Sequence, residues 1–273
     1  LLDAPGFIDR WYKFVESTAR YSQPELNFGG SIALFSAIVG RRIIDDHGTT
    51  PNLYTLNIAP PGAGKDHIRG LNKRLLVECG AEHLIGPESI GSGQGLAAAV
   101  LESPACFIQW DEIGKFFDSI KGNRIASHLI KIQEVMLSMF SSAGGRWIGN
   151  ALADRSKVPS IEHPSLTVLG TTTPDILRSL ERGNISDGLI PRFLIFESPG
   201  KGRLRRTKPN QELPDQCVKM AKHLIGGGLQ VNGQDSGLSL DQLDDSDRKP
   251  ALRVLQRTEE ADQRLFDHGY AIS

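Results

Sequence analysis

Two hydrophobic patterns with helical spacing open the chain. In residues 5–20, and again in residues 24–44, apolar side chains recur every three or four positions. This is the spacing of one face of an α-helix. The first of these faces carries Phe7, Trp11 and Phe14. We therefore expect two amphipathic helices in this part of the chain.

Four later apolar runs are too short for helices and are bounded by turn residues, which is typical of buried strands. They are residues 53–58, 105–110, 166–170 and 193–197. Segments with helical spacing separate them, most clearly at 67–79 and 125–139. Strands that alternate with helices favour an α/β fold with a mainly parallel sheet flanked by helices.

Two segments depart from this alternation. Residues 141–164 contain glycines, prolines, basic residues and Trp147, and we expect an exposed hairpin or long loop there. Residues 200–210 form a basic linker with five Lys or Arg side chains, and helices are expected at 214–225 and 250–270. The predicted organisation is a helical segment at 1–48, a core at 49–200, and a linker with a C-terminal helical segment at 201–273. We expect the chain to be a piece of a longer protein.

The composition is that of a globular protein, with 39% hydrophobic and 23% charged residues among 273. A net charge of −1 gives no overall cationic field, so a nucleic-acid partner would have to bind local basic stretches. Cys79, Cys106 and Cys217 are scattered, so they predict packing in a reducing cytoplasm, not disulfides or zinc. The apolar runs are shorter than the roughly 20 residues of a membrane span, so no membrane association is expected.

The most informative segment joins the first predicted strand to a helix. It reads Ala59-Pro60-Pro61-Gly62-Ala63-Gly64-Lys65-Asp66. Backbone N–H groups and the helix N-terminus can surround phosphate there, and Lys65 can reach the β- and γ-phosphates. The candidate nucleotide-binding residues are Pro61, Gly62, Ala63, Gly64, Lys65 and Asp66. Alternatively, the segment is a Gly/Pro-rich turn with an exposed lysine.

Two positions of this loop depart from the usual phosphate-binding pattern. Ala59 stands where the first glycine is expected, and Asp66 stands where a Ser or Thr hydroxyl normally holds magnesium. An aspartate can bind the metal directly or through water, but it also brings a negative charge close to the phosphates. Asp66 is therefore a candidate Mg²⁺ ligand whose mode of binding stays open.

Two carboxylates, Asp111 and Glu112, follow the second predicted core strand directly. The carboxyl ends of strands are where open α/β sheets bind ligands. Asp111 is suited to hold Mg²⁺ through a bound water, and Glu112 to polarise the water that attacks the γ-phosphate. An acidic pair in this position can instead be a charge feature of a helix N-terminus.

Two further groups are candidates for catalysis. Thr171 or Thr172, at the end of the third core strand, can place a hydroxyl between the acidic pair and the γ-phosphate, or can cap a helix before Asp175. Arg192 can act as an arginine finger on the nucleotide of a neighbouring subunit, or can be a salt-bridged surface residue.

These blocks, in this order, resemble the P-loop ATPase domain of phage and plasmid primase-helicases, relatives of superfamily-three ring helicases and the AAA+ class. The resemblance covers residues 53–196 and rests most on 164–174 and 187–193. It implies hydrolysis of ATP with Mg²⁺ in a ring-shaped homo-oligomer such as a hexamer, with single-stranded or forked DNA in the channel. It also places DNA contacts on the hairpin, where the candidates are Arg146, Arg155 and Lys157, with Trp147 packing or stacking.

Two other functions compete with a DNA-dependent motor. A nucleotide-binding switch or interaction module with weak or no hydrolysis is suggested by Asp66 in place of a hydroxyl residue. A small-molecule or nucleoside kinase is the third possibility. It is weaker because the Asp111–Glu112 pair favours activation of water over an acceptor substrate, and because no arginine-rich lid is evident.

Overall fold

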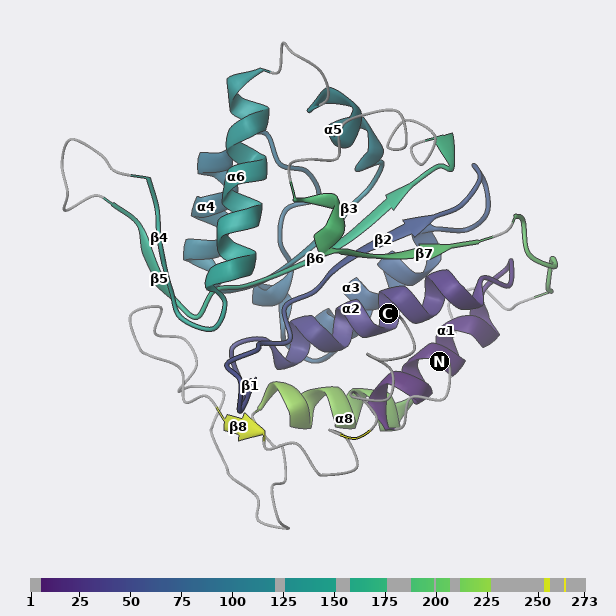
Figure 1. Ribbon diagram of the computed structural model, residues 1–273. Helices are drawn as coiled ribbons and strands as arrows, with labels where there is room; N and C mark the ends of the chain where they lie inside the picture. Colours follow the sequence, from purple (N-terminus) through teal and green to yellow (C-terminus); the bar gives the residue numbers. More distant parts are fainter. Residues whose placement is uncertain are drawn as a thin grey trace.

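A four-stranded parallel sheet lies at the centre of the fold (Figure 1). The computed structural model describes residues 6–120, 126–150, 158–175, 188–198, 200–206, 212–226, 253–255 and 263. The order of the central strands is β3-β6-β2-β7, and every neighbouring pair is parallel. These strands are β2 (Tyr54–Ile58), β3 (Ala105–Trp110), β6 (Ser165–Thr172) and β7 (Phe193–Glu197). The prediction of an α/β fold with a mainly parallel sheet is confirmed.

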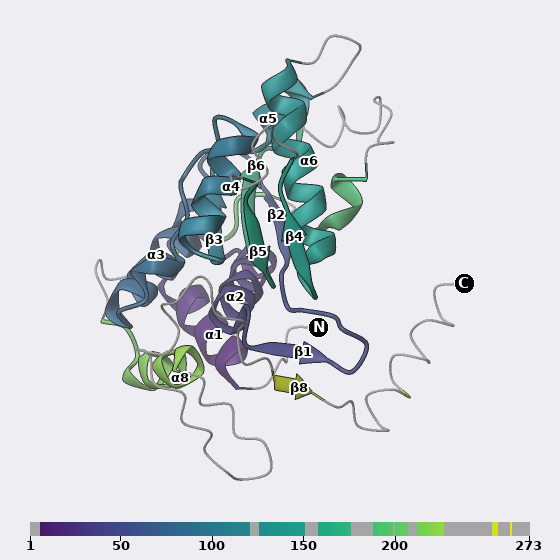
Figure 2. The same cartoon turned by 90° about the vertical axis from the view of Figure 1, so that its left-hand side faces the viewer.

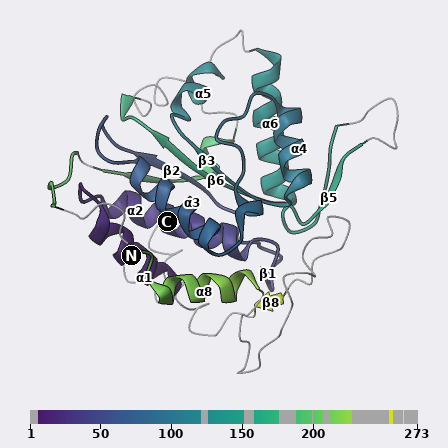
Figure 3. The ribbon, with the colours of Figure 1, turned by 180° about the vertical axis from the view of Figure 1, so that it is seen from behind.

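Helices cover both faces of this sheet (Figures 1 and 3). One face carries α4 (Gly93–Glu102), α5 (Gly114–Ser119) and α6 (Ser127–Ser142). The other carries α1 (Phe7–Thr18), α2 (Pro24–Val39), α3 (Asp66–Glu78) and α8 (Asp215–Ile225). Two short 3-10 turns, at Glu82–Leu84 and Ile190–Arg192, complete the helical elements of the described residues. Burial on both faces explains the nearly continuous apolar runs of β2, β3 and β6. In the edge strand β7, by contrast, Leu194 and Ile195 are exposed.

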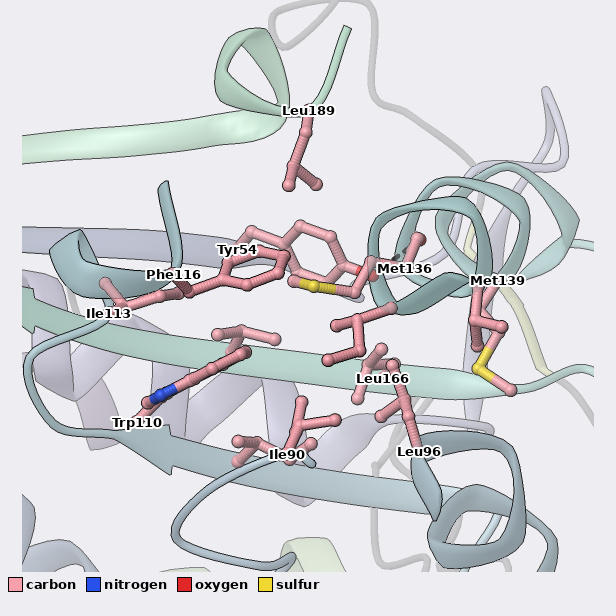
Figure 4. Packing of buried hydrophobic residues seen from close by; sticks show 14 of the residues in the cluster. Tyr54, Ile90, Leu96, Trp110, Ile113, Phe116, Met136, Met139, Leu166 and Leu189 are labelled. Atoms are coloured by element: carbon pink, nitrogen blue, oxygen red, sulfur yellow. Dashed lines mark hydrogen bonds between the residues drawn. The ribbon is translucent and has the colours of Figure 1, made fainter. Parts of the chain in front are cut away.

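Between the first face of the sheet and its helices lies a core of aromatic and aliphatic side chains (Figure 4). Tyr54 of β2 is fully buried there, and its hydroxyl donates a 2.8 Å hydrogen bond to the Met136 carbonyl of α6. Trp147 is 4% exposed and donates from its indole nitrogen to the Ser138 hydroxyl. These buried polar atoms are satisfied, so the large rings add apolar burial without leaving a donor unpaired.

On the second face, α2 packs against both the sheet and α3, and glycine makes its close approach to α3 possible. A Cβ atom on Gly30 would lie 2.3 Å from Cγ1 of Ile68, which is fully buried in α3. The neighbouring Asn72 accepts a hydrogen bond from the Trp11 indole and donates one to the Gly30 carbonyl. The packing of α2 against α3 therefore fixes the position of the helix that follows the loop predicted to bind phosphate.

Replacing Gly30 by alanine is expected to destabilise the fold by about 1–3 kcal/mol, because overpacking at Ile68 exceeds the gain of about 1 kcal/mol in helix propensity. Urea unfolding of the single variants and of Gly30→Ala combined with Ile68→Ala measures this effect. The added methyl should cost less in the Ile68→Ala background. Strict additivity of the two changes would contradict a steric origin.

The structure corrects three predictions about individual elements. The second helix ends at Val39, not near residue 44, because Gly40 leaves the helical conformation and Arg41 has a φ of 61°. The following β1 (Ile43–Asp45) pairs in parallel with β8 (Arg253–Leu255) (Figure 2). Residues 253–255 were expected to be helical. The third core strand reaches Thr172 instead of ending at residue 170, because it pairs with β2 along its whole carboxyl half.

The expected hairpin is present as β4 (Arg146–Ile148) paired antiparallel with β5 (Ser160–Glu162). Cys79, Cys106 and Cys217 are free and buried, and burial raises the pKa of Cys106 to about 12. The division into three segments stays a prediction. In the part of the chain that the structure describes, no helix has both the length and the apolarity to span a bilayer.

Candidate nucleotide site

The loop between β2 and α3 stands at the carboxyl edge of the sheet. Because the four strands are parallel, the residues that follow β3 and the last residues of β6 lie at this same edge. Gly62 and Gly64 have φ values of 72° and 89°, a region that side chains with a Cβ rarely adopt. The glycines therefore allow the tight turn that brings Lys65 to the start of α3.

Lys65 is held at the base of this loop by main-chain carbonyls. Its Nζ donates to the Ala59 oxygen at 2.9 Å and to the Thr172 oxygen at 3.0 Å. Partial burial lowers the pKa of Lys65 and outweighs the opposing attraction of Asp111, Asp66 and Glu112. All three acidic residues thus lie close enough to act on the ammonium group.

A residue of β6 fixes the position of Asp111, on the acidic side of the site. The hydroxyl of Thr171, fully buried in β6, donates to Asp111 Oδ1 at 2.7 Å. Burial raises the pKa of Asp111, but the hydrogen bond from Thr171 and the Arg69 guanidinium more than offset this, so the pKa lies below its ordinary value. Asp111 is therefore held as a carboxylate. Because Thr172 contacts Lys65, two adjacent residues of β6 join the two halves of the site.

A guanidinium bridges the two carboxylates predicted to bind magnesium. Arg69 Nη1 lies 2.8 Å from Asp66 Oδ1 and 3.3 Å from Asp111 Oδ1, and its Nη2 donates to the Gln109 carbonyl. The side chain of Arg69 is only 11% exposed. One cation already serves both carboxylates, so the pair can share a positive charge. Within the described ranges, no group of three or more His, Cys, Asp or Glu is placed to hold a metal ion.

Glu112 is in a strained backbone conformation. Its φ of 49° lies in the left-handed region, which costs a non-glycine residue about 1–3 kcal/mol. The turn is held because the next residue, Ile113, donates its N–H to the Thr171 carbonyl at 3.1 Å. The carboxylate is exposed and forms an ion pair with Lys115. Strain of this kind concentrates at functional sites, which is consistent with a role for Glu112.

Arg192 lies at the opposite edge of the sheet from Lys65. It immediately precedes β7, whose first residue pairs with the first residue of β2, whereas Lys65 follows the last. Its guanidinium donates to the Gly188 carbonyl and the Ser141 hydroxyl and lies 5.7 Å from the Phe140 ring. Arg192 therefore lies away from the loop before α3 in its own chain, and a contact with nucleotide would have to be made to a neighbouring copy.

The hairpin residues proposed for DNA contacts are placed only in part. Arg146 is exposed on β4 and forms an ion pair with Glu162 of β5. Arg155 and Lys157 lie outside the described residues. Trp147 is packed in the core, so the alternative of packing applies and stacking on a base would require it to leave the fold.

Two residues of the site were missed by the sequence reasoning. Arg69 follows Asp66 by three positions, a spacing at which helix side chains interact, so the ion pair had a local signal. Gln23 had none. It is 2% exposed, and its side-chain amide donates to the carbonyls of Ala63 in the loop and of Gly200 after β7, both at 3.1 Å.

The lowered pKa of Asp111 predicts a pH-dependent contribution to stability. The folded-state pKa lies below the ordinary value of 3.8, so the contribution is present above that value and is lost as the pH falls through the folded-state pKa. Asp111→Asn should therefore be less stable than the original chain near neutral pH, and the difference should shrink below about pH 4. Urea midpoints at several pH values test this, and a constant difference would contradict it.

Comparisons with known proteins add no assignment. No protein-family model matches the chain, and no curated protein matches it.

Proposed function

We propose that the chain is a P-loop nucleoside triphosphatase that hydrolyses ATP with Mg²⁺. One observation carries the proposal: Lys65 and Asp111 are bound by consecutive residues of β6, Thr172 and Thr171. A phosphate-gripping amine and a carboxylate are thereby brought to the same edge of a parallel sheet. Positioning and electrostatic stabilisation are the main tasks of a protein that transfers a phosphoryl group to water.

The residues divide these tasks. The glycine turn and the N-terminus of α3 offer backbone N–H groups to phosphate oxygens, and Lys65 supplies a positive charge. Asp111, with Asp66 as the second candidate, would hold Mg²⁺ together with phosphate oxygens, which is the usual mode for this ion. Glu112 would orient the attacking water, and Thr171 would keep Asp111 in position. Arg69 has to release one or both carboxylates when the metal binds.

We further propose that this ATPase is the motor of a phage or plasmid DNA helicase or primase-helicase. Support comes from the resemblance in residues 53–196 and from the position of Arg192, which suits a contact between copies. The proposal includes a cytoplasmic ring-shaped homo-oligomer on single-stranded or forked DNA. Arg146 on the hairpin is the described candidate for a DNA contact, and Arg155 and Lys157 are candidates from the sequence.

A nucleotide-binding switch with weak hydrolysis is the second candidate. The observation that favours it is the Arg69 bridge, because a guanidinium between Asp66 and Asp111 competes with a metal for both carboxylates. A chain in which that competition is not overcome would hold nucleotide without efficient turnover.

Steady-state release of phosphate from ATP, measured with and without Mg²⁺ and with and without single-stranded DNA, tests these alternatives. The proposed motor predicts Mg²⁺-dependent turnover that DNA stimulates. Saturable ATP binding with no turnover would support the switch instead. An identically purified Lys65→Ala preparation controls for contaminating ATPases, and the absence of ATP binding by the original chain would contradict both candidates.

A further inference from the structure

The segment after β7 folds back onto the phosphate-binding loop. Ser198 continues the pairing with β2 by donating its N–H to the Ile58 carbonyl at 2.9 Å, and its hydroxyl donates to the Gly200 carbonyl. Gln23 then joins Gly200 to Ala63 through the two hydrogens of one buried amide. The beginning of the basic linker is therefore attached to the loop itself.

The other side of this segment is attached to the junction between α1 and α2. The Arg205 guanidinium forms an ion pair with Glu16 at 3.0 Å, and the main-chain N–H of Arg205 donates to the Arg20 carbonyl. Gly202 approaches Ser22 so closely that an added Cβ would lie 1.7 Å from the Ser22 carbonyl oxygen. Both neighbours of Lys201 in the chain, Gly200 and Gly202, are thus packed against other parts of the fold.

The ammonium group of Lys201 lies close to Gly62 in the loop. A Cβ atom on Gly62 would lie 3.5 Å from Lys201 Nζ and 3.7 Å from its Cε. The side chain is exposed, and no hydrogen bond or ion pair links it to another described residue. The segment is seen beside the loop at one end of the sheet in both Figure 1 and Figure 3.

The order of the strands places Lys201 and Asp111 on opposite sides of the loop. Asp111 follows β3, which is separated from β2 by β6, whereas Lys201 follows β7, the neighbour of β2 on the other side. A polyanion bound at the loop would therefore have Lys65 at the start of α3, the carboxylates on the side of β3, and Lys201 on the side of β7. An exposed ammonium held beside a backbone anion site favours phosphate binding, because it adds a point charge without needing a fixed direction.

We propose that Lys201 is a second phosphate-binding lysine, which contacts the polyphosphate of the bound nucleotide from the β7 side. The inference rests on the proposed nucleotide site and adds a residue that the loop motif does not contain.

The test compares affinities for a non-hydrolysable ATP analogue and for AMP, both with Mg²⁺. Lys201→Ala is expected to lower the affinity for the ATP analogue about tenfold. The affinity for AMP should change by less than about twofold, since the lysine contacts the polyphosphate. Lys201→Arg should retain most of the affinity because the charge is kept. Lys219→Ala, which removes an exposed lysine on α8, is the matched control for net charge.

The possible failures are distinguishable. If Lys201→Ala binds the analogue as tightly as Lys219→Ala while Lys65→Ala loses it, the inference on Lys201 is wrong and the nucleotide site stands. An equal loss for AMP and the ATP analogue would also overturn it, since that result would indicate a general disturbance of the loop. If Lys65→Ala also binds normally, the proposed nucleotide site itself is wrong.

Discussion

Lys65→Ala is expected to lower the affinity for ATP by about 100-fold or more, equivalent to ~3 kcal/mol. The reason is the loss of a half-buried ammonium group that, in the proposed function, forms charge-assisted hydrogen bonds with two phosphates. Titration with a fluorescent ATP analogue measures the effect, and phosphate release should fall to the background rate.

The same variant should remain folded. The amine binds two carbonyls, but the Thr172 carbonyl also accepts the Ala59 N–H at 3.2 Å and therefore keeps a partner. We expect a loss of about 1 kcal/mol in the free energy of unfolding, measured by urea denaturation. Lys219→Ala is the control for charge. Retained binding by a folded Lys65→Ala protein would refute the assignment of the loop.

Substitution of Glu112 is expected to lower turnover by about 10²–10⁴-fold while ATP binding is preserved, because the carboxylate is proposed to polarise water in the transition state. Two variants separate chemistry from stability. Glu112→Gln keeps the size of the side chain, and Glu112→Asn places at a φ of 49° a residue that adopts the left-handed region more readily. Both should lose activity, yet Glu112→Asn should unfold at the same or a higher temperature than the original chain.

Single-turnover hydrolysis and thermal unfolding, measured on the same preparations, provide this comparison. Turnover that survives in Glu112→Gln would assign the water-activating role elsewhere. A melting temperature of Glu112→Asn well below that of Glu112→Gln would show that the left-handed conformation is not a source of strain. Lys115→Ala, which removes the ion-pair partner of Glu112 and leaves its carboxylate, is the control for local charge.

The sheet and its edge were predictable because their signals are local. Short apolar runs typical of strands alternate in the sequence with segments of helical spacing, and glycines with a lysine follow the first core strand. Parallel pairing then brings the carboxyl ends together, so the approach of Asp111 and Thr171 to the Lys65 loop followed from the position of each in its strand. The chemical roles of these residues stay predictions.

Other elements had weak or misleading local signals. The helix α4 was not predicted: glycines at 93 and 95 and three successive alanines give little periodicity, although Ser92 caps it by accepting the Gly95 N–H. Residues 253–255 form a strand only by pairing with β1, more than 200 positions earlier. Long-range contacts of this kind decide the state of segments whose own preference is weak.

The contacts of the linker could not be predicted for the same reason. Nothing around Gln23 indicates that its amide joins Ala63 to Gly200, because the three residues meet only when β7 pairs with β2. The basic residues after β7 were interpreted as a separate linker, and charge content alone favours that interpretation. The attachment of Arg205 to Glu16 and Ser22 depends on a fold that brings the start of the chain close to the segment after β7.

The two neighbouring threonines of β6 have a mechanical consequence. Thr171 binds the Asp111 carboxylate through its side chain, and Thr172 binds the Lys65 amine through its main chain. A displacement of β6 therefore moves both groups together. Their separation is therefore insensitive to bending of the sheet. A change in that separation has to come from the first turn of α3 or from the turn after β3, and Arg69 connects these two turns through Asp66 and Asp111.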